Sequence, residues 1–193
     1  MKIAIVGTSG SGKTTLAKKL SEVLGCIHIE QDAYAWSPGW IKKDDEKILG
    51  EVKEALKAPS WVICGNYSLT RDIAWKEATH VIWLAFPFRI ILWRLLKRTI
   101  RNILTKKEIA GGNKESFYMQ FFTKKSIFVW AIQTHSKRKK TYNLLLKSGE
   151  YDSSKILVLK RPRQVDELIV KELFKKSGTS SLALSADKQA ASR

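Results

Sequence analysis

Short apolar runs alternate with segments of helical periodicity along most of the chain. The runs are KIAIV (2–6), CIHI (26–29), WVIC (61–64), HVIWLA (80–85) and KILVL (155–159). Nearly continuous apolar runs of this length are typical of strands that are covered on both faces, as in a parallel sheet. Residues 13–24 and 45–57, which lie between these runs, carry leucine, isoleucine and valine at helical spacing. The alternation predicts an α/β domain with right-handed crossovers.

The periodicity stops at Ser177. The remaining residues, SGTSSLALSADKQAASR, predict a disordered tail over 177–193. Residues 1–176 are enough for one domain with one core, and no repeat of 20 to 50 residues suggests an array.

One segment, residues 79–96, resembles a membrane span, but Pro87, Arg89 and Arg94 interrupt it. Charge is expensive inside a bilayer, so this segment predicts a buried strand that turns into a helix, and no membrane partner is expected. The first apolar run is too short for a signal peptide. The only two cysteines, Cys26 and Cys64, do not suit a disulfide scaffold or a zinc site, which favours a reducing, cytoplasmic location.

The loop after the first run reads GTSGSGKTT and matches the pattern G-x-x-x-x-G-K-[ST], with a predicted strand before it and a helix after it. Glycines let backbone N–H groups turn around a phosphate, and the helix directs its positive dipole end at the same place. Lys13 is placed to bridge the β- and γ-phosphates, and the Thr14 hydroxyl suits Mg²⁺. We therefore expect ATP and Mg²⁺ as ligands, with phosphate contacts from Gly7, Thr8, Ser9, Gly10, Ser11, Gly12, Lys13, Thr14 and Thr15.

With this loop near the start of a small α/β domain, the chain resembles the adenylate-kinase-like P-loop kinases. More narrowly, it is similar to the bacterial DNA topology modulation proteins (FlaR-like). The resemblance covers residues 1 to about 175 and is most specific in the segments GNYS, WRxxxRT and GNxES. It implies the P-loop NTPase fold: a five-stranded parallel sheet in the order 2-3-1-4-5, flanking helices and a small helical lid at about residues 102–125.

The resemblance also implies an acceptor site between the ends of the second and third strands. Asp32 follows the second strand, where related kinases place an acid toward the acceptor hydroxyl; Asp is also a common turn residue. Trp36 and Trp40 are candidates to line the acceptor pocket or to pack in the core or the lid. Further candidates follow the third strand: Gly65, Asn66, Tyr67 and Arg71. Arg71 suits an anionic group of the acceptor, or an ordinary pair with Asp72 or Glu77.

Basic residues gather in one third of the chain. Residues 89–147 hold 15 Lys or Arg and two acids, which gives 15 − 2 = +13 of the formal net charge of +17. Arg94, Arg98 and Arg101 share one helical face. By the resemblance, Arg94 and Arg98 contact the nucleotide or the transferred phosphoryl group. The run at 137–140, KRKK, could add phosphate contacts or form a solvated helix end.

The sequence departs from its relatives at two strand ends. Cys64 stands where an acid of a D-G-N-Y pattern is expected, and Ala85 stands where the fourth strand of relatives often has another acid. Such an acid normally holds Mg²⁺ opposite the loop hydroxyl. Asp32 or Glu30 are the candidates to replace it.

Two hypotheses follow from the sequence. The first is an ATP-dependent phosphotransferase that acts on a small acceptor such as a nucleotide or another metabolite, with Lys13, Asp32, Arg94 and Arg98 as the catalytic residues. The second is a nucleotide-regulated nucleic-acid-binding protein with little or no kinase activity. The sequence pI of about 9.9 permits the second hypothesis.

Overall fold

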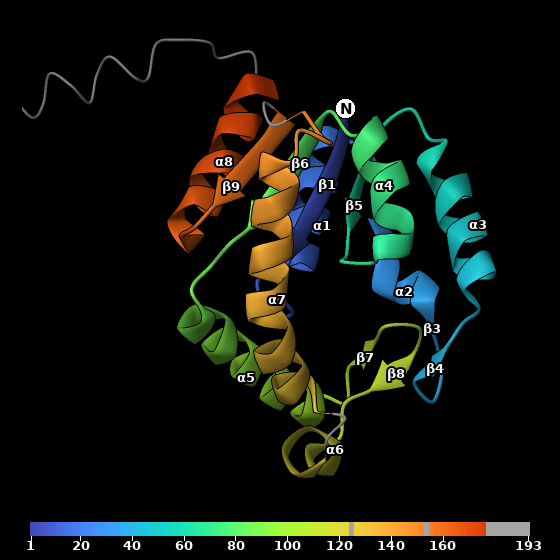
Figure 1. Cartoon of the computed structure of the whole chain (residues 1–193). Coiled ribbons are helices and arrows are strands. Elements are labelled where there is room, and N and C mark those ends of the chain that lie inside the picture. The colour runs from blue at the N-terminus through green and yellow to red at the C-terminus, as the bar shows by residue number, and fades with distance from the viewer. Residues whose placement is uncertain (124–125, 153–154, 177–193) are drawn as a thin grey trace, which may run out of the picture.

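In the computed structural model, which describes residues 1–123, 126–152 and 155–176, five parallel strands form the central sheet (Figure 1). The strands are β1 (Lys2–Gly7), β2 (Ile27–Glu30), β5 (Trp61–Cys64), β6 (His80–Leu84) and β9 (Ile156–Leu159). Their order across the sheet is β2-β5-β1-β6-β9. Numbered as the five predicted strands, this is 2-3-1-4-5, so the predicted fold class and strand order are confirmed.

Helices cover both faces of this sheet (Figure 1). One face packs against α3 (Asp45–Leu56), α4 (Ser68–Glu77) and α7 (Ile127–Lys147), and the other against α1 (Lys13–Leu24), α8 (Pro162–Lys176) and the start of α5 (Phe88–Leu104). Successive side chains of β5 alternate between the faces: Trp61 and Ile63 join the first core, and Val62 and Cys64 join the second. Cys64 therefore lies on the side of α1.

Aromatic rings fix α7 against the sheet. Tyr142 of α7 stacks on Trp75 of α4 with ring centroids 5.9 Å apart and meets the edge of Trp83 of β6 at 5.4 Å. Tyr151, which follows α7, meets Trp75 at 5.0 Å. Large buried aromatic rings contribute strongly to packing. This cluster therefore fixes the position of α7 relative to the sheet, and with it the positions of the side chains that α7 carries.

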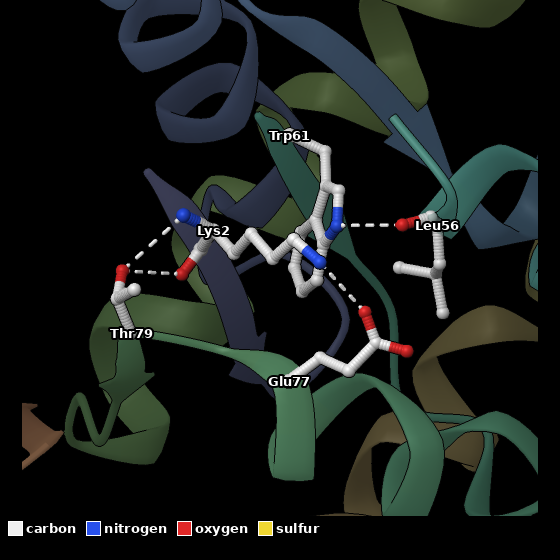
Figure 2. Close-up of polar contacts among 5 residues, drawn as sticks. All are labelled: Lys2, Leu56, Trp61, Glu77 and Thr79. Atoms are coloured by element: carbon white, nitrogen blue, oxygen red, sulfur yellow. Dashed lines mark hydrogen bonds and ion pairs between the residues drawn. The ribbon is translucent and has the colours of Figure 1, made fainter. Parts of the chain in front are cut away.

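The amino end of the sheet is closed by polar contacts around Lys2 (Figure 2). The Lys2 N–H donates to Thr79 Oγ1 at 3.2 Å, and that hydroxyl lies 2.8 Å from Lys2 O. The Lys2 ammonium pairs with Glu77 at 2.8 Å, and the buried Trp61 Nε1 donates to Leu56 O at 3.2 Å. The Lys2 contacts tie the start of β1 to the segment just before β6, and the Trp61 contact ties the start of β5 to the end of α3. The loops considered below lie at the other end of the sheet, where the strands end.

Small elements gather at the end of the sheet where the parallel strands end. They are α2 (Gln31–Ala35), an antiparallel hairpin of β3 (Trp36–Ser37) and β4 (Ile41–Lys42), a second hairpin of β7 (Glu108–Ile109) and β8 (Asn113–Lys114), and α6 (Phe117–Phe122). The β7–β8 hairpin and α6 fall within the lid predicted for 102–125, of which 124–125 lie outside the described residues. The tail predicted for 177–193 also lies outside them.

The apolar segment 79–96 forms β6 and the first part of α5, as predicted, and Pro87 caps the helix. Among the described residues, no helix combines the length and apolar character that a membrane crossing requires.

Candidate nucleotide and acceptor site

The glycine-rich loop connects β1 to α1. Gly12, the residue before the helix, has a left-handed backbone with φ of 96°, which glycine adopts without steric cost. A Cβ on Gly7 would lie 2.7 Å from Ser11 Oγ and 2.9 Å from Leu84 O, so this position also excludes a side chain. Ser11 Oγ is buried and has no hydrogen-bond partner among the described residues. The loop thus offers a polar cradle in which a phosphate fits.

Lys13, the first residue of α1, points back over this loop. Its ammonium donates to Thr8 O at 3.3 Å, and within the described chain no carboxylate pairs with it. The pKa of Lys13 is lowered to about 8, chiefly by removal from water; Asp32 and Cys64 oppose this shift, and Arg138 and Arg98 add to it. A cation held in this way favours an anionic ligand.

Two of the predicted arginines lie on the other side of the loop, on α5. Arg94 Nη1 donates to Ser11 O at 3.2 Å, and its guanidinium lies 5.3 Å from the centre of the Phe86 ring. Arg98 Nη2 lies 3.6 Å from Oε1 of the buried Glu115. Arg94, Arg98 and Arg101 all line one cleft of about 1700 Å³, together with Lys13 and Asp32. The arginine stripe therefore faces the nucleotide loop.

Asp32 lies on α2, beside the acceptor candidates. Tyr67 OH donates to Asp32 Oδ1 at 3.0 Å and accepts from Trp36 Nε1 at 3.0 Å. Burial, and after it the Asp32 charge, raises the pKa of Tyr67, so the phenol stays a hydrogen-bond donor. Trp40 meets Trp36 edge to face at 6.0 Å, and both rings line the cleft. The structure thus brings Asp32, Tyr67 and the two tryptophans together.

Gly65 and Asn66 line the cleft, and both also hold the loops in place. Asn66 pairs with both backbone groups of Gly7: Oδ1 accepts from Gly7 N at 3.1 Å, and Nδ2 donates to Gly7 O at 2.7 Å. Tyr142 OH donates to Asn66 Oδ1 at 3.0 Å. A Cβ on Gly65 would lie 2.0 Å from Gln31 Oε1, so α2 can approach only a glycine there.

Arg71 takes the second of its two predicted roles. Its Nε pairs with Asp72 Oδ1 at 3.0 Å, and Tyr151 OH donates to the same oxygen at 2.8 Å. Arg71 is not among the residues that line the cleft. The local pairing with Asp72, rather than an acceptor contact, is what the structure favours.

Arg138 of α7 is a site residue that sequence reasoning did not single out from the run at 137–140. Lys137, Lys139 and Lys140 are exposed, whereas Arg138 lines the cleft and its Nη1 is buried without a hydrogen-bond partner in the described part of the chain. Its guanidinium lies 5.7 Å from the centre of the Trp130 ring. Desolvation lowers the pKa of Arg138, and the nearby Tyr142, Asp32 and Tyr67 oppose this shift. Helical spacing from the buried Ala131 and Tyr142 is the signal that could have identified it.

Oxygen groups beside the loop suit a magnesium ion. Thr14 Oγ1 donates to Glu30 Oε1 at 3.1 Å, and Cys64 Sγ lies 3.9 Å from the same hydroxyl. Glu30 and Cys64 are partners in the register of β2 and β5. Burial raises the pKa of Cys64 to about 12, so it stays a neutral thiol that Mg²⁺ does not prefer. Among the described residues no cluster of three or more His, Cys, Asp or Glu is placed to hold a metal. The two oxygen donors of Thr14 and Glu30 suit an ion whose other ligands are phosphates and water.

The family model described as "AAA domain" (AAA_18) matches residues 3–120. The chain belongs to the AAA_18 family. A Pyrococcus furiosus protein named "Putative adenylate kinase" is 47% identical over 53 residues, which are 28% of this chain and 24% of that protein. The uncharacterized protein YqaC of Bacillus subtilis is 30% identical over 116 residues, 58% of this chain and 64% of YqaC. The matches thus cover less than two thirds of either relative.

Solved structures show the fold of this AAA_18 protein. Shikimate kinase from Acinetobacter baumannii in complex with shikimate superposes with a TM-score of 0.54 at 16% identity, over 94% of this chain and 95% of the kinase. Deoxyadenosine kinase from M. mycoides with bound dATP gives 0.53 at 15% identity, over 90% and 99%. At these identities the likeness is one of fold alone, that of the P-loop kinases.

The lowered pKa of Lys13 predicts a pH dependence of nucleotide affinity. Phosphate binds the protonated ammonium, and the empty protein loses that proton as the pH rises through about 8. Affinity for ADP should therefore fall about tenfold between pH 7.5 and pH 9, with uptake of about one proton on binding at pH 9. Calorimetry in buffers of different ionisation enthalpy measures both quantities.

The matched control is Lys57→Ala, which removes an exposed lysine of α3's end and should leave the pH profile unchanged. Equal affinities at pH 7.5 and pH 9, without proton uptake, would contradict the assignment of Lys13.

Proposed function

We propose that this protein is an ATP-dependent phosphotransferase that transfers the γ-phosphoryl group of ATP to a hydroxyl of a small anionic acceptor. The observation that carries the proposal is the common cleft: the glycine-rich loop with Lys13, the arginines of α5 and the carboxylate of Asp32 all line it. A nucleotide loop alone serves many activities, but an acid and a cation opposite the loop suit a second substrate.

The nucleotide half of the site supplies positive charge. Backbone N–H groups of the loop and the Lys13 ammonium bind the β- and γ-phosphates, and Arg94 lies against the loop at Ser11. Arg98 donates to charge that develops on the transferred group. Thr14 and Glu30 would hold Mg²⁺, which neutralises phosphate charge when bound.

The acceptor half of the site supplies a proton acceptor and an anion contact. Asp32 accepts the proton of the attacking hydroxyl as the new O–P bond forms and the bond between the γ-phosphorus and the bridging oxygen breaks, which releases ADP. Tyr67 donates to Asp32 and keeps that carboxylate in place. Arg138, whose buried Nη1 has no hydrogen-bond partner among the described residues, binds a carboxylate or phosphate of the acceptor. A hydroxy acid, or a nucleoside monophosphate that reacts at a hydroxyl of its sugar, fits this description.

The nucleic-acid alternative, and with it the narrower resemblance to DNA topology modulation proteins, stays a prediction. So does the cytoplasmic location. Since Arg94, Arg98, Arg101 and Arg138 line the cleft, the basic residues left for an extended polyanion are exposed ones such as Lys137, Lys139 and Lys140.

A phosphoryl-transfer screen tests the proposed reaction. Purified protein is incubated with Mg·ATP and a panel of nucleosides, nucleoside monophosphates, sugars and hydroxy acids, with the ATPase background measured in parallel. We expect transfer to at least one acceptor that carries an anionic group. Asp32→Asn should lower the kcat for this transfer by about 10²- to 10⁴-fold, because the general base is lost. Glu54→Gln, which removes an exposed carboxylate of α3, is the control.

Arg138→Met tests the anion contact with the same acceptor. It should raise the acceptor's KM by about tenfold or more and change the affinity for ATP much less, because in this proposal the guanidinium binds the acceptor directly and acts on the nucleotide half only through its electrostatic effect on Lys13. Transfer to none of the panel, or full activity of Asp32→Asn, would contradict the proposed reaction.

The metal site makes a separate prediction. Glu30→Gln should raise the Mg²⁺ concentration needed for half-maximal tightening of ATP binding by about tenfold, because an amide is a weaker magnesium ligand than a carboxylate. Since Cys64 is the register partner of Glu30, Cys64→Asp in the Glu30→Gln background should restore part of the loss. Calorimetry of ATP binding across a magnesium series, with melting temperatures of all variants, measures this. A Mg²⁺ dependence that Glu30→Gln leaves unchanged would exclude Glu30 as the metal carboxylate.

A further inference from the structure

Two hairpins that lie far apart in the sequence meet at the cleft. The acceptor hairpin, residues 36–42, carries Trp36 and Trp40; the lid hairpin, residues 108–114, follows α5. Figure 1 shows β3–β4 and β7–β8 side by side below the sheet. Their contact does not follow from either hairpin's own strand pairing, since each forms a separate two-stranded sheet.

One buried side chain joins them. Asn113 Oδ1 accepts from Trp40 N at 2.6 Å, and Asn113 Nδ2 donates to Ser37 O at 2.9 Å and to Ala110 O at 2.6 Å. The side chain is 3% exposed. One orientation of the amide satisfies all three contacts. No strand pairing joins one hairpin to the other among the described residues, and the Asn113 side chain supplies hydrogen bonds between them instead.

The backbones also approach each other closely at Gly111. A Cβ there would lie 2.0 Å from Trp36 O, a distance that no side chain tolerates. At the next residue, Gly112, a Cβ would lie 3.8 Å from Pro38 Cγ, an ordinary contact. Both glycines have left-handed backbones, with φ of 73° and 86°. Only Gly111 is therefore required by the contact between the hairpins.

The joined segment places a strained tryptophan. Trp40 has φ of 59°, a backbone conformation uncommon for a residue with a large side chain, and its N–H is the group that Asn113 accepts. The ring of Trp40 lines the cleft against Trp36. Asn113 thus positions a wall of the acceptor half of the site.

The same segment contacts the nucleotide half. Glu115, two residues beyond Asn113, is buried, pairs with Arg98 at 3.6 Å and accepts from Asn102 Nδ2 at 2.8 Å. A movement of Arg98 toward a phosphate therefore acts on Glu115, and through residues 113–115 on the acceptor hairpin. These residues make up most of the GNxES segment, GNKES at 112–116.

We propose that Asn113 and Glu115 are positioning residues that couple the two halves of the cleft, so that a nucleotide at the loop orders the acceptor hairpin through Arg98, Glu115 and Asn113. This proposal rests on the proposed function for the role of Arg98, but the contact between the hairpins is testable without any ligand. Coupling of this kind lets the acceptor pocket form fully only when the phosphoryl donor is bound.

The first arm of the test uses the protein without nucleotide. Hydrogen–deuterium exchange is followed at residues 36–42 in wild type, Asn113→Ala, Gly111→Ala and Gly112→Ala. Exchange there should accelerate about tenfold in Asn113→Ala and Gly111→Ala, which lose the hydrogen bonds or the close approach. Gly112→Ala carries the same left-handed strain without the clash and should exchange as wild type does. Unchanged exchange at 36–42 in both of the first two variants would overturn the proposal.

The second arm adds a non-hydrolysable ATP analogue with Mg²⁺, at concentrations that calorimetry shows to be saturating for each variant. In wild type, exchange should slow at both hairpins. In Asn113→Ala, and likewise in Glu115→Gln, slowing should persist at the loop of residues 7–15 and be lost at 36–42. Slowing at 36–42 that survives in these variants would overturn the coupling. If calorimetry detects no nucleotide binding to wild type, the proposed function fails, and with it the coupling, while the first arm still decides whether Asn113 joins the hairpins.

Discussion

The site depends on cations that the folded chain does not fully neutralise. Lys13 lies over the loop without a carboxylate partner among the described residues, and the guanidinium groups of Arg138 and Arg98 are near enough to lower its pKa. Arg138 itself keeps a buried donor unpaired within that part of the chain. Charges of one sign that are gathered and partly desolvated cost folding free energy, and a polyphosphate recovers that cost on binding. The cluster of positive charge that lowers the stability of the protein without ligand is also what favours an anionic ligand.

The fold brings these cations together with two kinds of anchor. On the sheet, the Asn66 amide pairs with both backbone groups of Gly7, which ties the end of β5 to the start of the loop. Above the sheet, Tyr142 contacts Asn66, and one turn earlier on the same helix Arg138 enters the cleft. The aromatic packing of Tyr142 against Trp75 and Trp83 therefore serves both the stability of the domain and the position of Arg138 in the cleft.

Much of the fold could be predicted because its signals are local. The five apolar runs correspond to the five strands of the central sheet, and the loop motif lies between a strand and a helix, as predicted. The strand order was predicted from the family resemblance. Asp32 and Tyr67 were acceptor-site candidates by the family resemblance, as residues that follow strand ends, and the structure joins them by one hydrogen bond. Arg71 shows the limit of this reasoning, since an arginine next to an aspartate can pair locally or face a ligand, and only the tertiary structure distinguishes the two.

The rest of the site could not be predicted because it depends on contacts between distant segments. In the sequence, Arg138 is one of four consecutive basic residues, and only the packing of α7 shows that it alone of the four lines the cleft. Asn113 joins the two hairpins through hydrogen bonds to Trp40 and Ser37, which lie 73 and 76 residues away in the sequence. Glu30 was one of two candidates that the sequence offered for the missing acid, and the sheet register, which puts it level with Cys64 and beside Thr14, is what distinguishes it from Asp32. Helical spacing from buried residues gave a signal for Arg138, but no periodicity or spacing in a single sequence reveals the contacts of Asn113 or this choice between Glu30 and Asp32.

Calorimetry of Mg·ATP binding to wild type and to Lys13→Ala, at pH 7 and with melting temperatures recorded, tests the central claim most directly. The account predicts one nucleotide bound per chain by wild type and an affinity at least about tenfold lower for Lys13→Ala, which loses a charge-assisted phosphate contact worth about 1.5–3 kcal/mol. The variant should melt no lower than wild type, because the lost ammonium is desolvated and has no carboxylate partner among the described residues. Equal affinities of a folded Lys13→Ala and wild type, or no binding by either, would contradict the account.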